Sequence, residues 1–368
     1  MIQVSEAKQY DVIIIGAGQA GLAIAFYLQR ANLNFILIDA HSKVGDSWRK
    51  RWDSLVLFSP VDYNHLPGMP FPRKSNEFPT KDEMAHYLDS YVKHYRFPIR
   101  LNEKVYEVIR DQRLFTIKTT KGVYKTHQVV VATGAFQTPF VPPFAKNAVK
   151  AVFQIHSSSY TNPSQITDDP ALVVGTGNSG VQIALELART RPVLLSGPEP
   201  RSVPRQILGK DLYWWYYALG ISNITKYSLL GRLMMGNEKK KGEPIIGNAL
   251  NRLKSFPNVH RMPHVVGVEG MTVLFRGGLR VKVKNIIWCT GFQNNYPWIK
   301  LDVFCQDGRP IEQRGVVRKI PGLYFIGLNW LYRMNSGQVG GVGRDARFLA
   351  QVIRKHKARL GRVPKVNS

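Results

Sequence analysis

Three glycines near the start of the chain stand at the spacing of a phosphate-binding loop. Gly16, Gly18 and Gly21 follow an apolar run, Val12 to Ile15, and lead into apolar residues at helical spacing, Leu22 to Leu28. A strand, turn and helix in this order present unpaired backbone N–H groups to phosphate oxygens. The first glycine makes the turn, the second lets the backbone approach a ligand, and the third lets the helix pack on the strand. The segment therefore predicts a dinucleotide site.

A carboxylate follows the next predicted strand. Phe35 to Ile38 is a short apolar run, and Asp39 comes directly after it. A carboxylate at this position accepts a hydrogen bond from a ribose hydroxyl and repels a ribose phosphate. The first site is therefore expected to bind an adenosine ribose without a 2′-phosphate.

The same pattern recurs in the middle of the chain. Ala171 to Val174 is an apolar run that leads into a glycine loop and then a predicted helix, Val181 to Ala188. The loop residues expected to bind a second nucleotide are Gly175, Gly177, Asn178, Ser179 and Gly180. One chain thus carries two predicted dinucleotide sites.

The second site lacks the carboxylate of the first. The strand Val193 to Leu195 ends in Ser196-Gly197-Pro198, and Arg201 and Arg205 follow. Arginines near this strand end favour a 2′-phosphate. The second site is expected to bind NADPH through Ser196, Arg201 and Arg205, with NADH as an alternative.

The elements that must position these loops indicate an α/β fold. Between the loops, the sequence predicts a helix and four short strands: Asp82 to His94, Val105 to Ile109, Leu114 to Thr119, Gly122 to Thr126 and Val129 to Val131. Pro139, Pro142 and Pro143 then mark a linker, and Thr290-Gly291 echoes an earlier turn, Thr133-Gly134. We expect two Rossmann-like domains, with residues 144–285 inserted between residues 1–143 and residues 286–368.

The C-terminal part predicts one more strand and a long helix. Leu323 to Ile326 reads as a strand that ends at Gly327, and Leu328 to Gly341 reads as a loop. A helix is expected from Arg344 or Asp345 to His356. Its N-terminus would stabilise negative charge on a bound group.

Basic residues exceed acidic residues throughout the chain. Lys and Arg number 51 against 25 Asp and Glu, which gives a net charge of +26. Phosphorylated cofactors, an anionic membrane surface and nucleic acid are the partners that such a charge could attract. The sequence contains no nucleic-acid-binding motif, so sequence-specific nucleic-acid binding is not expected.

Two cysteines, Cys289 and Cys305, are too far apart for a CxxC motif. Neither a disulfide framework nor a metal site is predicted, which suits a reducing compartment. The sequence shows neither a charged-then-apolar leader nor an apolar run of the ~18 residues that a membrane span needs. A cytoplasmic location is expected.

An aromatic run, Tyr213 to Tyr217, lies in the same region as the basic stretch Lys239 to Lys241. Such a combination is found where proteins rest on a membrane interface. The alternative, which we favour, is that the aromatic residues pack a substrate funnel or a subunit contact in a homodimer. Peripheral membrane contact therefore stays open.

With these segments in place, the chain resembles the class B flavoprotein monooxygenases, particularly the short bacterial members related to the flavin-containing monooxygenases. The resemblance extends over nearly the whole chain. Besides the two glycine loops, it rests on Gly45-Asp-Ser-Trp48-Arg49, Leu66-Pro-Gly-Met-Pro-Phe-Pro72, Thr133-Gly134, Thr290-Gly291 and Gly340-Gly-Val-Gly-Arg-Asp345. It implies that residues 144–285 form an NAD(P) domain inserted into an FAD domain.

The resemblance also implies how FAD is held. Trp48 and Arg49 would lie along the cofactor, Val105 near its adenine, and the Gly340 to Gly341 turn with Gly327 over its isoalloxazine end. The FAD-binding residues that it implies are Gly16, Gly18, Gln19, Ala20, Gly21, Asp39, Trp48, Arg49, Val105, Thr133, Gly134, Gly327, Gly340 and Gly341.

The implied reaction is reduction of FAD by NADPH, followed by transfer of one oxygen atom from O2 through a C4a-peroxyflavin to a small-molecule substrate. A soft nucleophile such as a sulfide or an amine is expected before a ketone, because Tyr160 stands where Baeyer-Villiger enzymes have Trp. Arg49, Ser59 and His156 are the catalytic candidates. His156 and Tyr160 match the second half of the family pattern FxGxxxHxxxY.

Two alternatives remain open at this point. One is an NAD(P)H-dependent quinone or oxygen reductase that transfers no oxygen atom to a substrate. The other is a membrane-associated redox sensor in which FAD only reports on NADPH.

Overall fold

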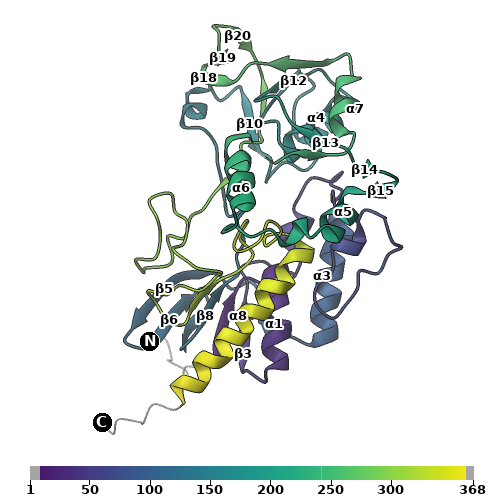
Figure 1. The fold of residues 1–368 in the computed structure, drawn as a ribbon. Coiled ribbons are helices and arrows are strands. Elements are labelled where there is room, and N and C mark those ends of the chain that lie inside the picture. The colour runs from purple at the N-terminus through teal and green to yellow at the C-terminus, as the bar shows by residue number, and fades with distance from the viewer. Residues whose placement is uncertain (1–8, 242, 362–368) are drawn as a thin grey trace.

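The computed structural model describes residues 9–241 and 243–361, which form two α/β halves, one above the other in Figure 1. The lower half is built on a parallel sheet. Its strand order is β23 (Leu323–Phe325), β8 (Val129–Val131), β2 (Val12–Ile15), β3 (Phe35–Ile38) and β4 (Ile99–Arg100). The strands β2, β3 and β8 occupy the predicted residues. Short, wholly apolar runs are what a parallel sheet buried on both faces requires.

Different layers cover the two faces of the lower sheet. The helices α1 (Gln19–Arg30), α3 (Lys81–Tyr95) and α8 (Val339–Leu360) pack on the face where Ile14 lies. The antiparallel strands β5 (Val105–Asp111), β6 (Leu114–Thr119) and β7 (Gly122–Thr126) cover the face where Ile13 lies, and β1 (Gln9–Tyr10) pairs with β7.

The upper half repeats this plan. Its parallel sheet has the order β10 (Phe153–His156), β21 (Asn285–Trp288), β11 (Ala171–Val174), β12 (Val193–Ser196) and β17 (Val259–Met262). Helices α4 (Asn178–Leu187) and α7 (Ala249–Lys254) cover one face, and the strands β18 (Val265–Glu269), β19 (Thr272–Phe275) and β20 (Arg280–Lys282) cover the other. The predicted α/β class with two Rossmann-like domains is confirmed.

Short elements fill the junction between the halves and its surroundings. They are the helices α2 (Asp46–Arg49), α5 (Leu212–Ala218) and α6 (Leu229–Lys241), and the strand pairs β13 (Ser202–Val203) with β16 (Ile245–Ile246), β14 (Gln206–Ile207) with β15 (Lys210–Asp211), and β9 (Thr138–Pro139) with β22 (Phe292–Gln293). None of the helices within the described residues is long and apolar enough to cross a membrane.

The predicted return to the first domain at residue 286 is wrong by several residues. β21 pairs with β10 and β11 in the upper sheet, so Ile286 to Trp288 belong to the inserted half. The chain crosses back only after this strand, where β22 pairs with β9. Thr290-Gly291 resembles Thr133-Gly134, which follows β8 of the lower sheet, and this similarity suggested that both turns belong to one domain. Thr290-Gly291 instead follows β21 of the upper sheet.

Candidate functional site

The first glycine loop is shaped by two close backbone contacts. Gly16 has φ of 106°, and a Cβ there would lie 2.7 Å from the Ala132 carbonyl oxygen at the end of β8. A Cβ on Gly21 would lie 2.0 Å from the Gly16 carbonyl oxygen, so no side chain fits between the turn and α1. A Cβ on Gly18, in contrast, would have no heavy atom within 4 Å. The loop is thus tight against the protein on one side and open on the other.

The helix that follows this loop keeps its N-terminal N–H groups available. Gly18 is the N-cap residue of α1, and among the described residues no side chain caps this end and no acidic residue stands in its first turn. A helix N-terminus without a side-chain cap leaves donors that need an external partner. Phosphate oxygens beside Gly18 would satisfy these donors.

Asp39 closes the same site from the end of β3. Its carboxylate accepts hydrogen bonds from the Ala17 N–H at 2.6 Å and from the His41 N–H at 2.8 Å, and it pairs with His41 Nδ1 at 2.9 Å. Burial disfavours the charged carboxylate, but the hydrogen bonds from His41 and Ala17 outweigh it, so the pKa of Asp39 is lowered. Asp39 therefore lies beside the glycine loop as an ionised acceptor.

The second loop reproduces the geometry of the first. Gly175 has φ of 115°, and a Cβ there would lie 2.2 Å from the Cys289 carbonyl oxygen after β21. A Cβ on Gly180 would lie 1.9 Å from the Gly175 carbonyl oxygen, whereas a Cβ on Gly177 would meet nothing within 4 Å. Among the described residues, α4 also has neither a side-chain cap nor an acidic residue in its first turn, which contains Asn178 and Ser179. This loop is equally open to a phosphate.

The end of β12 differs from the prediction. Ser196 is fully buried, and its hydroxyl donates to the Pro263 carbonyl oxygen at 2.7 Å and accepts from the Val265 N–H at 3.2 Å. The Ser196 side chain is therefore used inside the protein and does not face a nucleotide. Gly197 packs on Thr176, where a Cβ would lie 2.9 Å from Thr176 Cγ2. This contact explains why a residue without a side chain stands at the end of β12.

An arginine from a neighbouring strand occupies this region instead. Arg261, on β17, donates from Nη2 to the carbonyl oxygens of Gly197 at 3.0 Å and Pro198 at 3.2 Å. Its guanidinium also lies 3.8 Å from a Glu199 carboxylate oxygen. Sequence analysis missed Arg261 because it is remote in sequence, and only the pairing of β17 with β12 brings it here.

The two predicted arginines separate in the structure. Arg201 is exposed, next to β13. Arg205 lies at the junction of the two halves, where Nη1 donates to the Phe58 carbonyl oxygen at 2.5 Å and the guanidinium stacks 4.4 Å above the Phe78 ring. Arg205 therefore joins the inserted half to the lower half, and its predicted role in binding a 2′-phosphate is not supported.

Residues 45–49 contact the first turn of α1 through Trp48. Trp48 Nε1 donates to Gln19 Oε1 at 3.3 Å, which places this side chain beside the first turn of α1. Arg49 turns to its own helix, where Nη1 donates to Asp46 Oδ1 at 2.7 Å and to the Val44 carbonyl oxygen at 3.0 Å. Trp48 is thus poised at the site, and Arg49 stabilises the buried Asp46.

Ser59 is buried and paired with a residue that sequence analysis did not select. Its hydroxyl donates to Asn64 Oδ1 at 2.7 Å, and Asn64 Nδ2 donates back to the Ser59 carbonyl oxygen at 2.7 Å. The Ser59 hydroxyl and the Asn64 amide therefore find hydrogen-bond partners within the same turn. Asn64 is 2% exposed, and its burial becomes evident only in the structure.

His156 and Tyr160 serve the upper half. Both ring nitrogens of His156 have partners, Nδ1 with Ser158 Oγ at 2.9 Å and Nε2 with the Gly291 carbonyl oxygen at 3.0 Å. Burial lowers the pKa of His156. Tyr160 is fully buried and donates to Glu186 at 2.7 Å.

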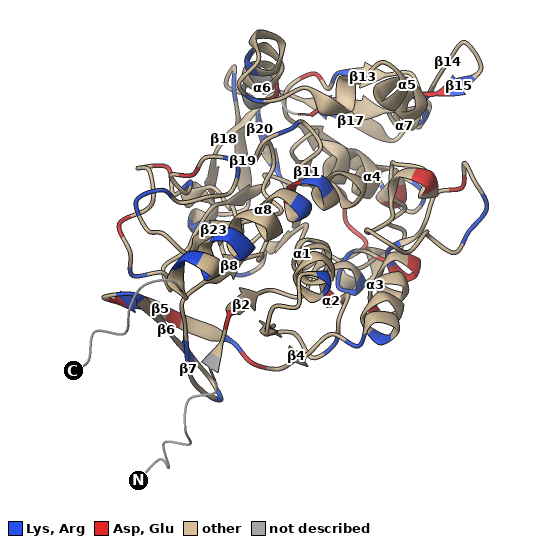
Figure 2. Cartoon of the chain, turned by 60° about the horizontal axis from the view of Figure 1, so that its bottom comes forward, with Lys and Arg blue, Asp and Glu red and all other residues tan. Residues whose placement is uncertain are grey.

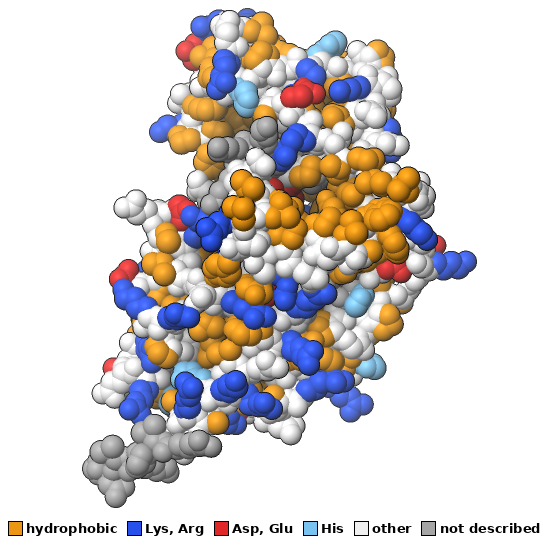
Figure 3. Space-filling view, in the orientation of Figure 1, with side chains coloured by type: hydrophobic (Ala, Val, Ile, Leu, Met, Phe, Trp, Pro, Cys, Tyr) orange, Lys and Arg blue, Asp and Glu red, His pale blue; other side chains and the backbone are white. Residues whose placement is uncertain are grey.

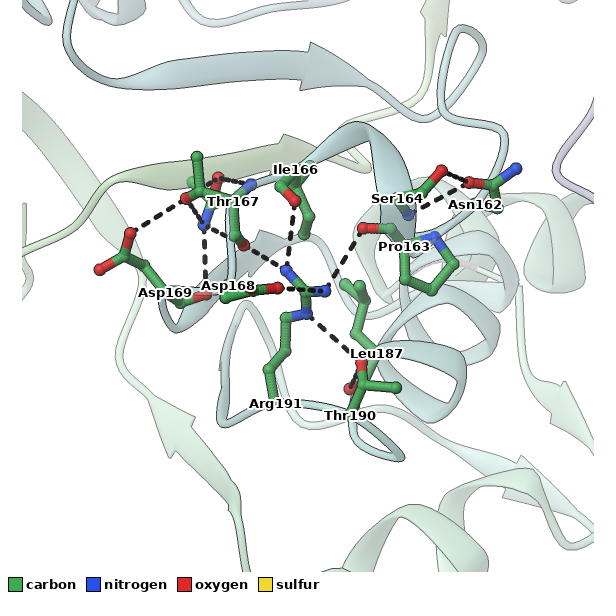
Figure 4. Close-up of polar contacts among 11 residues, drawn as sticks. Asn162, Pro163, Ser164, Ile166, Thr167, Asp168, Asp169, Leu187, Thr190 and Arg191 are labelled. Carbon is green, nitrogen blue, oxygen red and sulfur yellow. Dashed lines mark hydrogen bonds and ion pairs between the residues drawn. The ribbon is translucent and has the colours of Figure 1, made fainter.

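The segment after Tyr160 is held by one buried arginine. Figure 4 shows Arg191 reaching from the end of α4 to the carbonyl oxygens of Pro163, Ile166 and Thr167. This cluster attaches the segment that follows Tyr160 to the turn after α4.

The predicted turn at Gly340 and Gly341 is part of a helix. α8 begins at Val339, five residues before the expected Arg344, and both glycines lie in its first turn. A Cβ on Gly340 would lie 2.1 Å from the Tyr63 carbonyl oxygen, and one on Gly341 1.9 Å from the Asn335 carbonyl oxygen. The glycines are needed for close packing of the helix end.

Four other predicted FAD-binding positions differ in their surroundings. Gly327 has φ of 78° and faces Ala20 of α1, where a Cβ would lie 2.6 Å from the Ala20 Cβ. Gly134 has φ of 75° and opens onto free space, whereas the neighbouring Thr133 Oγ1 is buried without a partner in the described structure. Val105 is buried in the core below the sheet.

Comparison with known proteins identifies the family. The model of the pyridine nucleotide-disulphide oxidoreductase family matches residues 13–196. An uncharacterized CzcO-like oxidoreductase of Geobacillus kaustophilus is 42% identical over 348 residues, covering 94% of this chain and 99% of the relative. The probable indole-3-pyruvate monooxygenase YUCCA8 of Arabidopsis thaliana is 27% identical over 383 residues, covering 93% and 88%.

A solved structure has the same architecture. A flavin-containing monooxygenase from Stenotrophomonas maltophilia superposes with a TM-score of 0.77 at 24% identity, over 96% of this chain and 99% of that one. Family and fold imply FAD and NADPH as cofactors, and the open Gly18 and Gly177 beside uncapped helices fit two dinucleotides. The chain belongs to the pyridine nucleotide-disulphide oxidoreductase family and is a flavin-dependent oxidoreductase.

Proposed function

We propose that the protein is an FAD-dependent, NADPH-driven monooxygenase that transfers one oxygen atom from O2 to a soft nucleophile, a sulfide or an amine before a ketone. The observation that carries the proposal is the pair of open glycine loops, Gly16 to Gly21 and Gly175 to Gly180, in one chain. The monooxygenase names of the Arabidopsis and Stenotrophomonas proteins favour oxygen transfer over other flavin chemistry.

The residues of this chain bind and orient the two nucleotides in this proposal. The N–H groups at the start of α1 would hold the FAD phosphates, with Asp39 on the ribose, and those at the start of α4 would hold the NADPH phosphates. Bound FAD supplies hydride acceptance and oxygen activation. His156 has protein partners at both ring nitrogens, so we assign it a positioning role.

The test is a coupling measurement on the FAD-loaded protein. NADPH and NADH oxidation are followed with a panel of sulfides, amines and ketones, and oxygenated product and hydrogen peroxide are both quantified. We expect a sulfide or amine to give product in proportion to the NADPH consumed. Release of all oxygen as peroxide with every compound would contradict oxygen transfer.

The second candidate is an NAD(P)H-dependent quinone or oxygen reductase. It is favoured by the mutual hydrogen bonds of Ser59 and Asn64, which leave this candidate catalytic hydroxyl engaged with the protein. The same assay with a quinone as acceptor distinguishes the two, because a reductase reduces the quinone without oxygenated product.

A cytoplasmic location remains a prediction from the widely spaced cysteines.

A further inference from the structure

Apolar side chains gather on one exposed surface around the junction. We call this surface the leucine face and define it by Leu208, Leu219, Leu229, Leu230 and Leu233, which are 86%, 66%, 77%, 54% and 59% exposed. It runs from the β14–β15 hairpin past α5 to the start of α6, and Figure 3 shows hydrophobic side chains collected across the middle of this side of the molecule. Contiguous exposed apolar surface of this kind marks an interaction site.

At the tip of the β14–β15 hairpin, Leu208 has a positive φ, a conformation that residues other than leucine adopt more easily. Leu208 and Gly209 are the two turn residues between β14 and β15, with φ of 48° and 73°. Asn is the preferred first residue of such a turn, because a branched side chain at positive φ is strained. Leu208 therefore carries strain and gains almost no burial within the protein. An external apolar environment would supply the missing stabilisation.

The start of α6 presents its leucines from a fixed support. Leu229, Leu230 and Leu233 face outward, while the buried Gly231 packs so closely that a Cβ would lie 1.9 Å from the Thr225 carbonyl oxygen. Glu238 accepts from Trp330 Nε1 at 2.5 Å and attaches the helix further along. The outward direction of the leucines is thus set by packing on the opposite side.

Amphipathic side chains border the leucine face. Trp214 is 41% exposed, and Lys210 Nζ lies 5.7 Å from its ring centre. Trp215 Nε1 donates to the Ile207 carbonyl oxygen at 2.8 Å and joins α5 to the hairpin. Tryptophan and lysine beside exposed leucines are typical of the polar boundary of a lipid bilayer.

The same side of the molecule carries unbalanced positive charge. The exposed positions of α8 include Arg344, Arg347, Arg354, Lys355 and Arg359, whereas the one acidic residue of this helix, Asp345, is buried. Lys357 is also exposed, but it pairs with Asp11 at 2.5 Å. Figure 2 shows basic residues along α8, with the hairpin and α6 projecting on one side of the molecule, and Figure 3 shows basic side chains below the leucine face. Exposed cations beside an apolar surface complement anionic phospholipids.

We propose that the leucine face docks on an anionic phospholipid bilayer, with Leu208 and the leucines of α6 entering the interface and the basic residues of α8 providing electrostatic attraction. We infer a lipid surface as the partner because exposed leucines and basic side chains lie on the same side of the molecule, where they would meet acyl chains and anionic headgroups together. This proposal does not depend on which reaction the flavin catalyses.

The test is flotation of the full-length, FAD-loaded protein with vesicles of phosphatidylcholine, with and without phosphatidylglycerol. We expect flotation with anionic vesicles that weakens as salt rises. Leu229→Ser with Leu233→Ser is expected to reduce the bound fraction about tenfold or more, since each leucine that leaves lipid loses apolar transfer energy. Leu208→Asn should weaken binding while keeping the turn, because Asn suits positive φ.

The matched control is Leu279→Ser, which removes another leucine, 45% exposed, from the turn between β19 and β20 in the upper half. It should float like the unmodified protein. Equal flotation of all variants, or no flotation with anionic vesicles at low salt, would overturn the proposal. So would a dimer in solution that the Leu229→Ser and Leu233→Ser changes dissociate, because the leucine face would then bind a second copy of the chain.

Discussion

A methyl group added at Gly18 or Gly177 would enter open space, whereas one added at Gly21 or Gly180 would collide with backbone. The glycines of each loop therefore serve two different requirements. Two of them allow the protein to fold, and one leaves room for a ligand. This difference can be measured one residue at a time.

Gly18→Ala is expected to leave the unfolding midpoint of the cofactor-free protein unchanged and to weaken FAD binding roughly tenfold or more, because the methyl group occupies the space beside the helix N-terminus. Gly177→Ala should retain FAD and raise the KM for NADPH. FAD absorbance of the purified protein and steady-state kinetics separate the two effects. Gly21→Ala is the control for folding, and it should yield little folded protein. Loss of FAD from Gly177→Ala would contradict the assignment of the sites.

Arg261 tests the choice between NADPH and NADH. We expect Arg261, which lies beside the end of β12, to bind the 2′-phosphate of NADPH. Arg261→Gln should then lower kcat/KM for NADPH roughly tenfold or more, because a charge-assisted hydrogen bond is lost, and should affect NADH much less. An equal loss with both nucleotides would show that Arg261 only supports Gly197 and Pro198.

The Asp39–His41 pair predicts a pH dependence of stability. The hydrogen bond to Asp39 raises the pKa of His41 above 6.5, so this contribution is complete below that pH and is lost as pH rises through the folded-state pKa. The pKa of Asp39 is lowered below 3.8, so its contribution is present above that value and is lost only in acid. Unfolding midpoints measured from pH 5.5 to 8.5 should fall more steeply for the unmodified protein than for His41→Gln. Parallel curves would exclude the pair as the cause.

At the scale of elements, the strands beside each glycine loop were predictable and one helix start was not. Val12 to Ile15 and Ala171 to Val174 are apolar on both faces and lead into glycines, so local sequence alone defines them. Gly340 and Gly341 are expected from the sequence to end a loop, because glycine disfavours helices. In the structure both are helical, because Gly340 packs on Tyr63, which is distant in sequence, and Gly341 packs on Asn335, which precedes the helix.

Gly340→Ala measures how tightly the start of α8 is packed. In an exposed helix this change would stabilise by about 1 kcal/mol. Here the new Cβ would lie 2.1 Å from the Tyr63 carbonyl oxygen, so we expect destabilisation of about 1–3 kcal/mol. Gly361→Ala is the control at the other end of α8, where a Cβ would lie 3.9 Å from the Lys357 carbonyl oxygen, an ordinary contact distance. Denaturant unfolding compares the two variants, and equal stability would contradict close packing.

At the scale of the whole molecule, the two halves are joined by more than the chain that links them. Trp52, from the lower half in sequence, is buried in the core of the upper half, and Asp53 N–H donates to the Thr161 carbonyl oxygen at 2.8 Å. Tyr63 stacks on Tyr217 of α5 at 4.6 Å between ring centres. Sequence analysis predicted two domains but neither these contacts nor the site of β21, because they depend on tertiary packing between segments distant in sequence.

Arg205 tests whether this junction matters for catalysis. Arg205→Met removes the hydrogen bond to Phe58 and the charge above Phe78, so the relative position of the halves should loosen. We expect unchanged FAD content and a flavin reduction rate roughly three- to tenfold lower, because small misplacement of reacting groups is costly. Arg276→Met, an exposed arginine in the turn between β19 and β20, should reduce flavin at the normal rate. A normal flavin reduction rate for Arg205→Met would show that the contacts of Arg205 at the junction do not affect hydride transfer.

The insertion of one half into the other also bears on synthesis at the ribosome. The upper sheet has all its strands once β21 has been made as far as Trp288, whereas the lower half still lacks the strand β23 and the helix α8. The apolar side of α1 that α8 covers therefore stays exposed on the nascent chain while the inserted half is made. The half whose translation begins first is therefore the half completed last.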